Sequence, residues 1–167
     1  MLIALLLVSV GMLAWFVSCG PDKSYVAKKL EAQRYWHLKV NPLDLEQVKA
    51  YAKKFGYNED HYIVCDFGKW SGLKRFYVYD LENGERIMES YCMHGNGSGS
   101  TDVKPVFSNM PGSHASSIGV YVLCGIGSKN MKTSIRLEGL DSTNSNARPR
   151  GILIHSSWKT FRFHGQI

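Results

Sequence analysis

Residues 134–155 read SIRLEGLDSTNSNARPRGILIH, two apolar runs on either side of a loop rich in serine, asparagine and arginine. In the first run, hydrophobic residues alternate with charged ones, which is the period of a strand with one buried face. The second run is continuously apolar and follows a glycine, which is also typical of a strand. The pattern predicts strands at Thr133–Leu140 and Gly151–Ser156, with His155 emerging at the end of the second.

The same period of two extends toward the N-terminus and predicts four more strands. They are His61–Phe67, Leu73–Leu81, Glu85–Met93 and Ile118–Leu123. The dipeptide Asn83-Gly84 accepts positive φ at both central positions of a tight turn, so it predicts a hairpin between the second and third of these strands.

Two helices are predicted before the strands. Tyr25–Val40 carries apolar residues at approximately helical spacing. The second helix is expected to open at Asn41-Pro42, a capping residue followed by proline, and to run to Gly56. The fold class is therefore mainly β with N-terminal helices.

Length and composition favour one globular domain. A chain of 167 residues with 44% hydrophobic content can bury one core. The net charge of +6 comes from scattered lysines and arginines, and the aromatic residues occur in strand-like runs. Neither pattern is typical of a nucleic-acid surface, so no nucleic-acid partner is expected.

Residues 1–19 have no charged side chain and are dominated by apolar residues, which predicts an export or membrane signal. The sequence Phe16-Val17-Ser18-Cys19-Gly20 is similar to a bacterial lipoprotein cleavage box, in which the cysteine is acylated. Cys19 is therefore the candidate lipidation site, with an uncleaved signal anchor as the alternative. Either assignment implies membrane association.

Several motifs in order resemble the catalytic domain of the murein L,D-transpeptidases. They are Phe107-Ser108-Asn109, Ser116-Ser117-Ile118-Gly119-Val120-Tyr121, and the two runs and loop of residues 134–155. The resemblance implies an L,D-transpeptidase-like β-sandwich or mixed sheet over residues 61–167, after a helical segment at 20–60. It also implies an extracytoplasmic, periplasmic protein that acts on peptidoglycan stem peptides.

In the family that the chain resembles, a histidine in the setting of His155 deprotonates a cysteine thiol that attacks the stem peptide. A neighbouring imidazole raises the thiolate fraction of such a cysteine. The family cysteine follows the histidine in a Ser-x-Gly-Cys motif, and no such motif occurs between His155 and Ile167. The expectation is a catalytic domain incomplete at its C-terminus, with His155 as the catalytic residue present.

The resemblance also implies substrate contacts, for which the candidates are His94, Gly95, Ser117, Arg136 and Asn146. For Arg136, an alternative is an ion pair with Glu138 that orders the sheet. The glycine run at Gly95–Ser100 is expected to be a loop between strands and not a phosphate site, because no helix start follows it.

The remaining cysteines, Cys65, Cys92 and Cys124, lie in apolar runs without zinc-ligand spacing. They are expected to be buried and inert, with a Cys65–Cys92 disulfide left open as an alternative for an exported protein. The histidines form no ligand motif, so no metal and no cofactor are expected.

Three functions remain for the chain. The first is L,D-transpeptidase-type acyl transfer in the cell wall. The second is a catalytically inactive peptidoglycan-binding lipoprotein, and the third is a structural lipoprotein without peptidoglycan contact.

Overall fold

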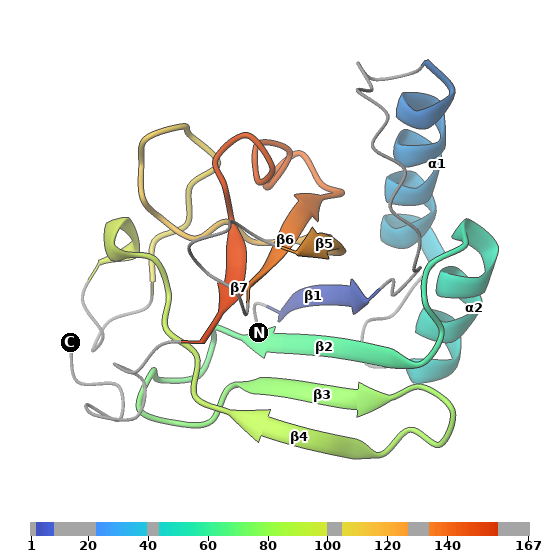
Figure 1. Cartoon of the computed structure of the whole chain (residues 1–167), viewed down its shortest axis with the longest axis horizontal. Helices are drawn as coiled ribbons and strands as arrows, with labels where there is room; N and C mark the ends of the chain where they lie inside the picture. The colour runs from blue at the N-terminus through green and yellow to red at the C-terminus, as the bar shows by residue number, and fades with distance from the viewer. Residues whose placement is uncertain (1–2, 9–22, 40–43, 100–104, 127–133, 157–167) are drawn as a thin grey trace.

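The computed structural model describes residues 3–8, 23–39, 44–99, 105–126 and 134–156. Within them, two helices stand at one end of a seven-stranded sheet (Figure 1). The elements in chain order are β1 Ile3–Val8, α1 Lys23–Lys39, α2 Leu45–Phe55, β2 His61–Asp66, β3 Phe76–Asp80, β4 Arg86–Ser90, the 3₁₀ turn η1 Asn96–Ser98, β5 Val120–Ile126, β6 Ser134–Gly139 and β7 Leu153–His155.

The strand order in the sheet is β4-β3-β2-β1-β5-β6-β7. Strands β2, β3 and β4 form one antiparallel unit, and β5, β6 and β7 form another. Strand β1 joins the two units because it pairs antiparallel with β2 and parallel with β5. The predicted class, mainly β with two N-terminal helices, is confirmed. The six predicted strands are present, five with narrower bounds and β5 shifted toward the C-terminus, from the predicted Ile118–Leu123 to Val120–Ile126.

Helix α2 begins later than predicted. Its N-cap is Asp44, whose carboxylate accepts hydrogen bonds from the Gln47 backbone N–H at 3.2 Å and from its side-chain amide at 2.7 Å. This arrangement satisfies an amide of the first turn that would otherwise lack a partner. The predicted start at Asn41-Pro42 lies outside the described residues. At the other end Gly56 adopts φ 70°, and its N–H bonds to α2 carbonyls, as expected for a helix C-terminus.

The β3–β4 hairpin is confirmed, and Asn83 and Gly84 lie in its turn, but the predicted two-residue geometry is wrong. Only Gly84 of this pair has positive φ, at 74°, and the connection is wider than two residues. The Asp80 carboxylate accepts bonds from the N–H groups of Glu82 and Asn83, and Gly84 N–H bonds to the Asp80 carbonyl at 2.9 Å. An aspartate that bonds to the backbone two residues later favours this wider turn.

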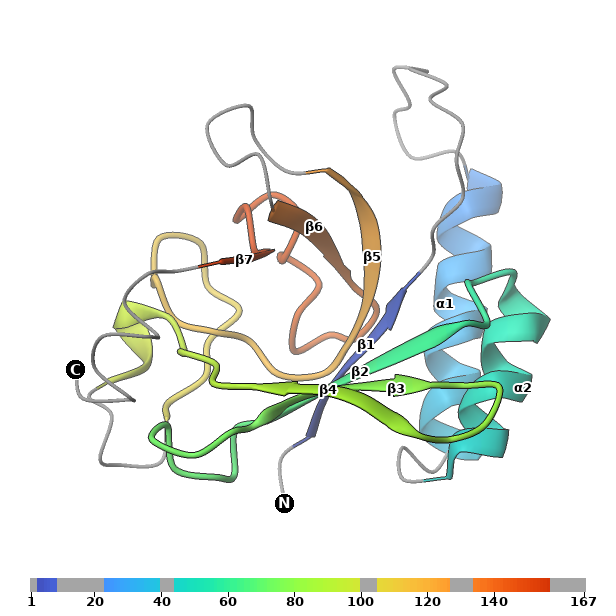
Figure 2. The same cartoon turned by 60° about the horizontal axis from the view of Figure 1, so that its bottom comes forward.

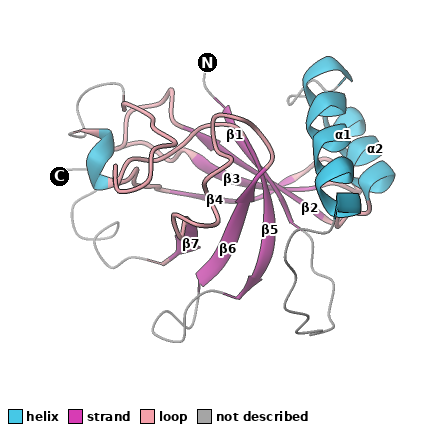
Figure 3. Ribbon diagram, turned by 90° about the horizontal axis from the view of Figure 1, so that it is seen from above, coloured by secondary structure: helices cyan, strands magenta, loops and turns pink. Residues whose placement is uncertain are grey.

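Alternation along the strands divides the core between the two faces of the sheet. One cluster packs against α1 and α2 and includes Tyr51, Phe55, Tyr62, Leu81, Val120 and Leu140. The other lies beneath the loop that joins β6 to β7 and includes Ile63, Tyr121, Leu123, Leu137 and Ala147. Figures 2 and 3 show the helices at one end of the sheet and the long loops toward the other.

Strand β1 falls within residues 1–19, the predicted export segment. Its backbone pairs on both sides, for example Leu6 with Ile63 and with Tyr121. An apolar run suits a strand inside a sheet as well as a signal, so composition did not separate the two. Cys19 lies outside the described residues, and the lipoprotein signal stays a prediction. Among the described residues, no helix has the length and apolar character needed to cross a bilayer.

Candidate functional site

The glycine-rich segment after β4 is held against the segment before β5 by hydrogen bonds from backbone N–H groups to serine hydroxyls and to a carbonyl. Gly95 N–H donates to Ser116 Oγ at 2.9 Å, Gly97 N–H donates to the His114 carbonyl at 3.0 Å, and Ser116 N–H donates to Ser98 Oγ at 2.8 Å. A side chain at Gly95 or Gly97 would collide with backbone atoms of 113–115. The two segments therefore meet closely only because glycine occupies these positions.

His94 is fixed by a buried arginine on the neighbouring strand segment. Arg75 is 1% exposed and donates to the Cys92 carbonyl at 2.7 Å, to the Lys69 carbonyl at 3.1 Å and to His94 Nδ1 at 3.1 Å. The guanidinium can only donate, so His94 Nδ1 accepts and Nε2 carries the proton. That proton is donated to the Gly99 carbonyl at 3.1 Å.

This environment favours a neutral imidazole at position 94. Burial lowers the pKa of His94, the bond to Gly99 raises it, and the charge of Arg75 lowers it, with a net shift below the ordinary value. The ring therefore links Arg75 to the glycine-rich segment at neutral pH.

Ser117 points into the interior. Its side chain is buried, and its Oγ lies 2.6 Å from the hydroxyl of Tyr121, which also donates to the Ser117 carbonyl at 2.8 Å. The Tyr121 hydroxyl thus helps to hold the backbone segment that precedes β5. Burial raises the pKa of Tyr121, so this phenol remains a donor at neutral pH.

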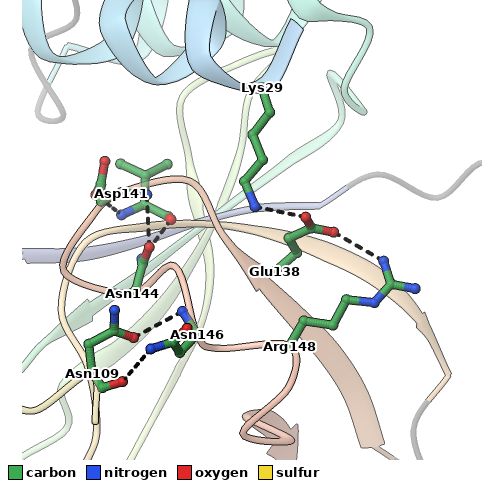
Figure 4. Close-up of polar contacts among 8 residues, drawn as sticks. Lys29, Asn109, Glu138, Asp141, Asn144, Asn146 and Arg148 are labelled. Carbon is green, nitrogen blue, oxygen red and sulfur yellow. Dashed lines mark hydrogen bonds and ion pairs between the residues drawn. The ribbon is translucent and has the colours of Figure 1, made fainter. Parts of the chain in front are cut away.

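Asn146, in the β6–β7 loop, pairs with Asn109 before β5. Its backbone N–H donates to Asn109 Oδ1 and its side-chain amide donates to the Asn109 carbonyl, both at 3.0 Å (Figure 4). Arg150 reinforces the same junction by donating to the Ser108 carbonyl at 2.7 Å and to Ser113 Oγ at 3.1 Å. These contacts hold the β6–β7 loop beside residues 108–113.

A second junction joins the same loop to β5. Val120 N–H donates to Asp141 Oδ2 at 2.6 Å, the Asn144 amide donates to the Val120 carbonyl at 2.8 Å, and Asn144 Oδ1 accepts from Asp141 N–H at 2.8 Å. Figure 4 shows Asp141 and Asn144 facing each other across this turn. Asn144 is 0% exposed, so its amide acts as a fixed internal connector.

His155 ends β7 and is exposed. Its Nδ1 lies 3.0 Å from the Ser156 carbonyl. A carbonyl oxygen only accepts, so Nδ1 carries the proton of the neutral ring and Nε2 keeps its lone pair. The side chain is not sealed in the interior, and the tautomer presents Nε2 as the atom that can accept a proton.

Arg136 shares a sheet face with His155. In the β6–β7 register Arg136 pairs with Leu153, and side chains of opposed residues lie on one face, as do those of residues two apart. Arg136 is exposed, and among the described residues no ion pair joins it to Glu138, the alternative partner suggested by the sequence. Glu138 instead accepts from Lys29 of α1 at 2.8 Å and from Arg148 at 3.2 Å (Figure 4).

The predicted site residues thus fall into two groups. His94, Gly95, Ser117 and Asn146 lie in the joined loops, whereas Arg136 and His155 lie on the last two strands. Within the described part of the chain, no hydrogen bond connects His155 to any of the other five. Likewise, no cluster of three or more potential ligand side chains there is placed to hold a metal ion.

Sequence reasoning missed the residues that build the junctions, above all Arg75, Asn109 and Asp141. An arginine within the apolar run Leu73–Leu81 was the available signal for Arg75. The contacts of Asn109 and Asp141 join segments more than 20 residues apart, so no local pattern reveals them.

The chain was compared with protein-family models, curated proteins and solved structures. Residues 33–162 match the model of the L,D-transpeptidase catalytic domain. The comparisons with curated proteins and with solved structures found no match. The matched region spans α2, six of the seven described strands and every junction described above. The chain belongs to the L,D-transpeptidase catalytic domain family.

Proposed function

We propose that this domain acts in peptidoglycan L,D-transpeptidation, acyl transfer from a stem peptide through a cysteine and a histidine. The family implies stem peptides as the substrate class and an extracytoplasmic location. The observation that carries the proposal is His155, an exposed imidazole at the end of β7 whose Nδ1–H is bonded to the Ser156 carbonyl.

His155 is assigned the role of general base. With Nδ1 protonated, Nε2 accepts the proton of the attacking thiol and donates it to the leaving amine of D-alanine. In the second half-reaction Nε2 takes a proton from the incoming amine and returns it to the cysteine sulfur that leaves. The thiolate attacks the carbonyl that follows the L-centre of the third residue of the stem, and D-alanine leaves. An amine of a second stem then opens the thioester.

The thiol is assigned to a Ser-x-Gly-Cys segment that follows His155 in the family order. Cys65 is buried, and its pKa is raised by the neighbouring Cys92 thiol and by burial. Burial also raises the pKa of Cys124. The Cys92 thiol donates to the Met93 carbonyl at 3.6 Å, and the Cys92 carbonyl accepts from Arg75 at 2.7 Å. None of these three thiols has the position of the family nucleophile.

Substrate binding is assigned to both groups of residues. Arg136 is exposed on the face of His155 and can form paired hydrogen bonds with a stem-peptide carboxylate. His94, Gly95, Ser117 and Asn146 are assigned to the wall of the site. For Ser117 and Asn146 this means shaping the loops, since their polar groups are bonded within the protein.

The test is an assay of D-alanine release from a tetrapeptide muropeptide, followed by mass spectrometry. It is run on the present chain and on a chain from a reading frame continued past Ile167 that supplies Ser-x-Gly-Cys. Activity in the second chain that falls at least about a hundredfold in His155→Asn, and persists in His61→Asn, supports the proposal. Binding to sacculi without D-alanine release by either chain supports the inactive peptidoglycan-binding alternative. Absence of both binding and release supports the third function, a structural lipoprotein without peptidoglycan contact.

Membrane attachment through Cys19 is part of the proposal. Acylation predicts a mature N-terminus at Cys19 carrying lipid, which mass spectrometry of the membrane fraction detects. An unmodified Met1 in that fraction supports the uncleaved anchor instead.

A further inference from the structure

The turn between β2 and β3 carries an exposed tryptophan. Trp70 is 49% exposed, and Leu73 in the same turn is 51% exposed. Leu73 N–H donates to the Trp70 carbonyl at 3.0 Å, which closes a tight turn over residues 70–73. Single exposed apolar residues are common on protein surfaces, so it is the pose of the Trp70 ring that sets this residue apart.

One face of the Trp70 indole lies against Gly72. A Cβ added at Gly72 would lie 2.4, 2.5 and 2.8 Å from three adjacent carbons of the six-membered ring. Such similar distances to three adjacent ring carbons occur only above or below the plane of the ring. The absence of a side chain at Gly72 therefore lets the indole lie flat on the turn, and the opposite face of the ring is left to solvent.

Hydrogen bonds anchor the backbone that precedes Trp70. Gly68 N–H donates to Asp66 Oδ1 at 3.0 Å, and Lys69 N–H donates to the Asp66 carbonyl at 3.1 Å. The Lys69 carbonyl accepts from the buried Arg75 guanidinium at 3.1 Å. The backbone that carries the indole is thus ordered in advance, which lowers the entropy cost of a contact with a ligand.

The same anchors connect the turn to the loops at the wall of the proposed site. Arg75, which holds the turn from inside, also donates to His94 Nδ1 at 3.1 Å. Phe67, three residues before Trp70, packs against Phe107 with ring centroids 5.7 Å apart. The turn is therefore held to the segment of His94 and to the segment that precedes β5.

We propose that the free face of Trp70 binds a sugar ring of the peptidoglycan glycan strand. The strand is a chain of N-acetylated sugars, and one face of such a ring presents C–H groups that carry a small positive charge. These groups match the negative face of an indole. The inference rests on the proposed function for the source of the glycan, and it adds a contact with the strand that bears the stem peptides.

The pose of the ring favours a sugar over a lipid bilayer. A tryptophan at a membrane surface extends its ring into the head-group region, and basic residues around it attract anionic lipids. Here the ring lies on its own turn. The nearby cations Lys74 and Arg86 share the carboxylate of Glu89, at 2.8 and 3.5 Å. A flat ring beside paired charges suits a neutral sugar better than an anionic membrane.

The experiment uses the full chain and glycan strands from which an amidase has removed the stem peptides. Binding is measured by isothermal titration calorimetry, and saturation-transfer NMR detects the sugar protons in contact with the protein. We expect Trp70→Ala to weaken binding by about fivefold to tenfold, the scale of one stacked aromatic contact. Leu73→Ala is the matched control, because it removes an equally exposed side chain from the same turn, and it is expected to leave binding unchanged.

Gly72→Ala tests the pose of the ring and keeps the ring itself. The added Cβ displaces the indole from the turn, because the Trp70 side chain is the part that can move. We expect Gly72→Ala to weaken glycan binding as much as Trp70→Ala does. The melting temperature of both variants is expected to stay within about 2 °C of the parent, since Trp70 is not a core residue.

Vesicles of phosphatidylcholine and phosphatidylglycerol are the second probe. Vesicle binding that Trp70→Ala removes and Gly72→Ala keeps, without glycan binding, would overturn the inference in favour of a lipid surface. Glycan binding that is absent in the parent, or that is the same in the parent and in Trp70→Ala, also overturns it, even if the chain extended past Ile167 releases D-alanine. Absence of D-alanine release together with glycan binding that depends on Trp70 overturns the proposed function alone.

Discussion

The guanidinium of Arg75 donates a hydrogen bond to Nδ1 of His94 at 3.1 Å, and this single contact sets the tautomer of the ring. The remaining proton on Nε2 is donated to the Gly99 carbonyl. A positively charged His94 would place two donors face to face. The neutral ring is therefore a component of the fold at the base of the glycine-rich segment.

Acidification is expected to loosen this segment. The pKa of His94 is lowered in the folded state, chiefly by burial, so the unfolded chain binds more protons between the folded and the unfolded pKa. The stabilisation is present above about pH 6.5 and is lost as pH falls through the folded pKa. We expect NMR titration to show His94 titrating below the ordinary range of a histidine side chain.

The matched variant for this prediction is Arg75→Met, which removes the donor to Nδ1. If His94 has an unchanged titration in that variant, the contact with Arg75 does not set its charge state. If the variant fails to fold, titration of the parent chain still decides whether the pKa of His94 lies below the ordinary range of a histidine.

Gly139 is needed because the Asn144 backbone lies against it. A Cβ at position 139 would collide with the Asn144 carbonyl and side-chain oxygens, and a carbonyl fixed in a turn cannot move aside. We expect Gly139→Ala to lower the free energy of unfolding by about 3 kcal/mol, measured by urea denaturation. Gly125→Ala is the control, since it meets nothing within 4 Å and has only its φ of 80° to strain, at about 1 kcal/mol. Equal losses would contradict the steric argument.

Alternation of apolar and polar residues was enough to predict six strands and the class of the fold. It could not predict β1, because a run that is apolar on both faces gives no period and has the composition of an export segment. It also misplaced the start of α2, where Asp44 rather than Asn41 is the cap. Local patterns cannot rank two capping residues that lie three positions apart.

The site was predictable only where a side chain is placed by its own strand. The place of His155 was predicted from the end of an apolar run. As expected, the residue lies at the end of β7. The alternative given for Arg136, an ion pair with Glu138, is not found among the described residues, where Lys29 of α1 pairs with Glu138. Such a partner depends on how a helix docks, which no spacing within the strand encodes.

Glu138 joins helix α1 to the sheet. Its substitution is expected to lower the free energy of unfolding more than the loss of a surface ion pair does. Its side chain is 10% exposed and accepts from both Lys29 and Arg148. We expect Glu138→Gln to lower the free energy of unfolding by about 1–2 kcal/mol, because two cations lose their acceptor in a partly buried place. Urea denaturation at constant ionic strength measures the change.

The control for Glu138 is Glu89→Gln. Glu89 bonds to Lys74 at 2.8 Å on the exposed hairpin, with side chains 36% and 48% exposed. An exposed pair of this kind contributes little to the free energy of unfolding, because water screens its charges. A loss at Glu138 no greater than at Glu89 would show that α1 is not held to β6 through this carboxylate.

Removal of residues 1–19 is expected to open the sheet between its two antiparallel units. Strand β1 pairs Leu6 with Ile63 of β2 and Leu7 with Val122 of β5, so its loss leaves unpaired backbone groups on both neighbours. Hydrogen exchange is expected to accelerate at amides of β2 and β5, while the β3–β4 amides, such as that of Val78, keep their protection.

The shortened chain is also expected to self-associate through the two exposed edges, which size-exclusion chromatography detects. Unchanged exchange in β2 and β5 together with a monomeric elution would show that β1 is dispensable for the sheet. That result would fit cleavage before Cys19, because an export signal removed on maturation cannot remain as a strand. Accelerated exchange confined to β2 and β5 would instead require the mature protein either to retain β1 or to fill its place with another strand.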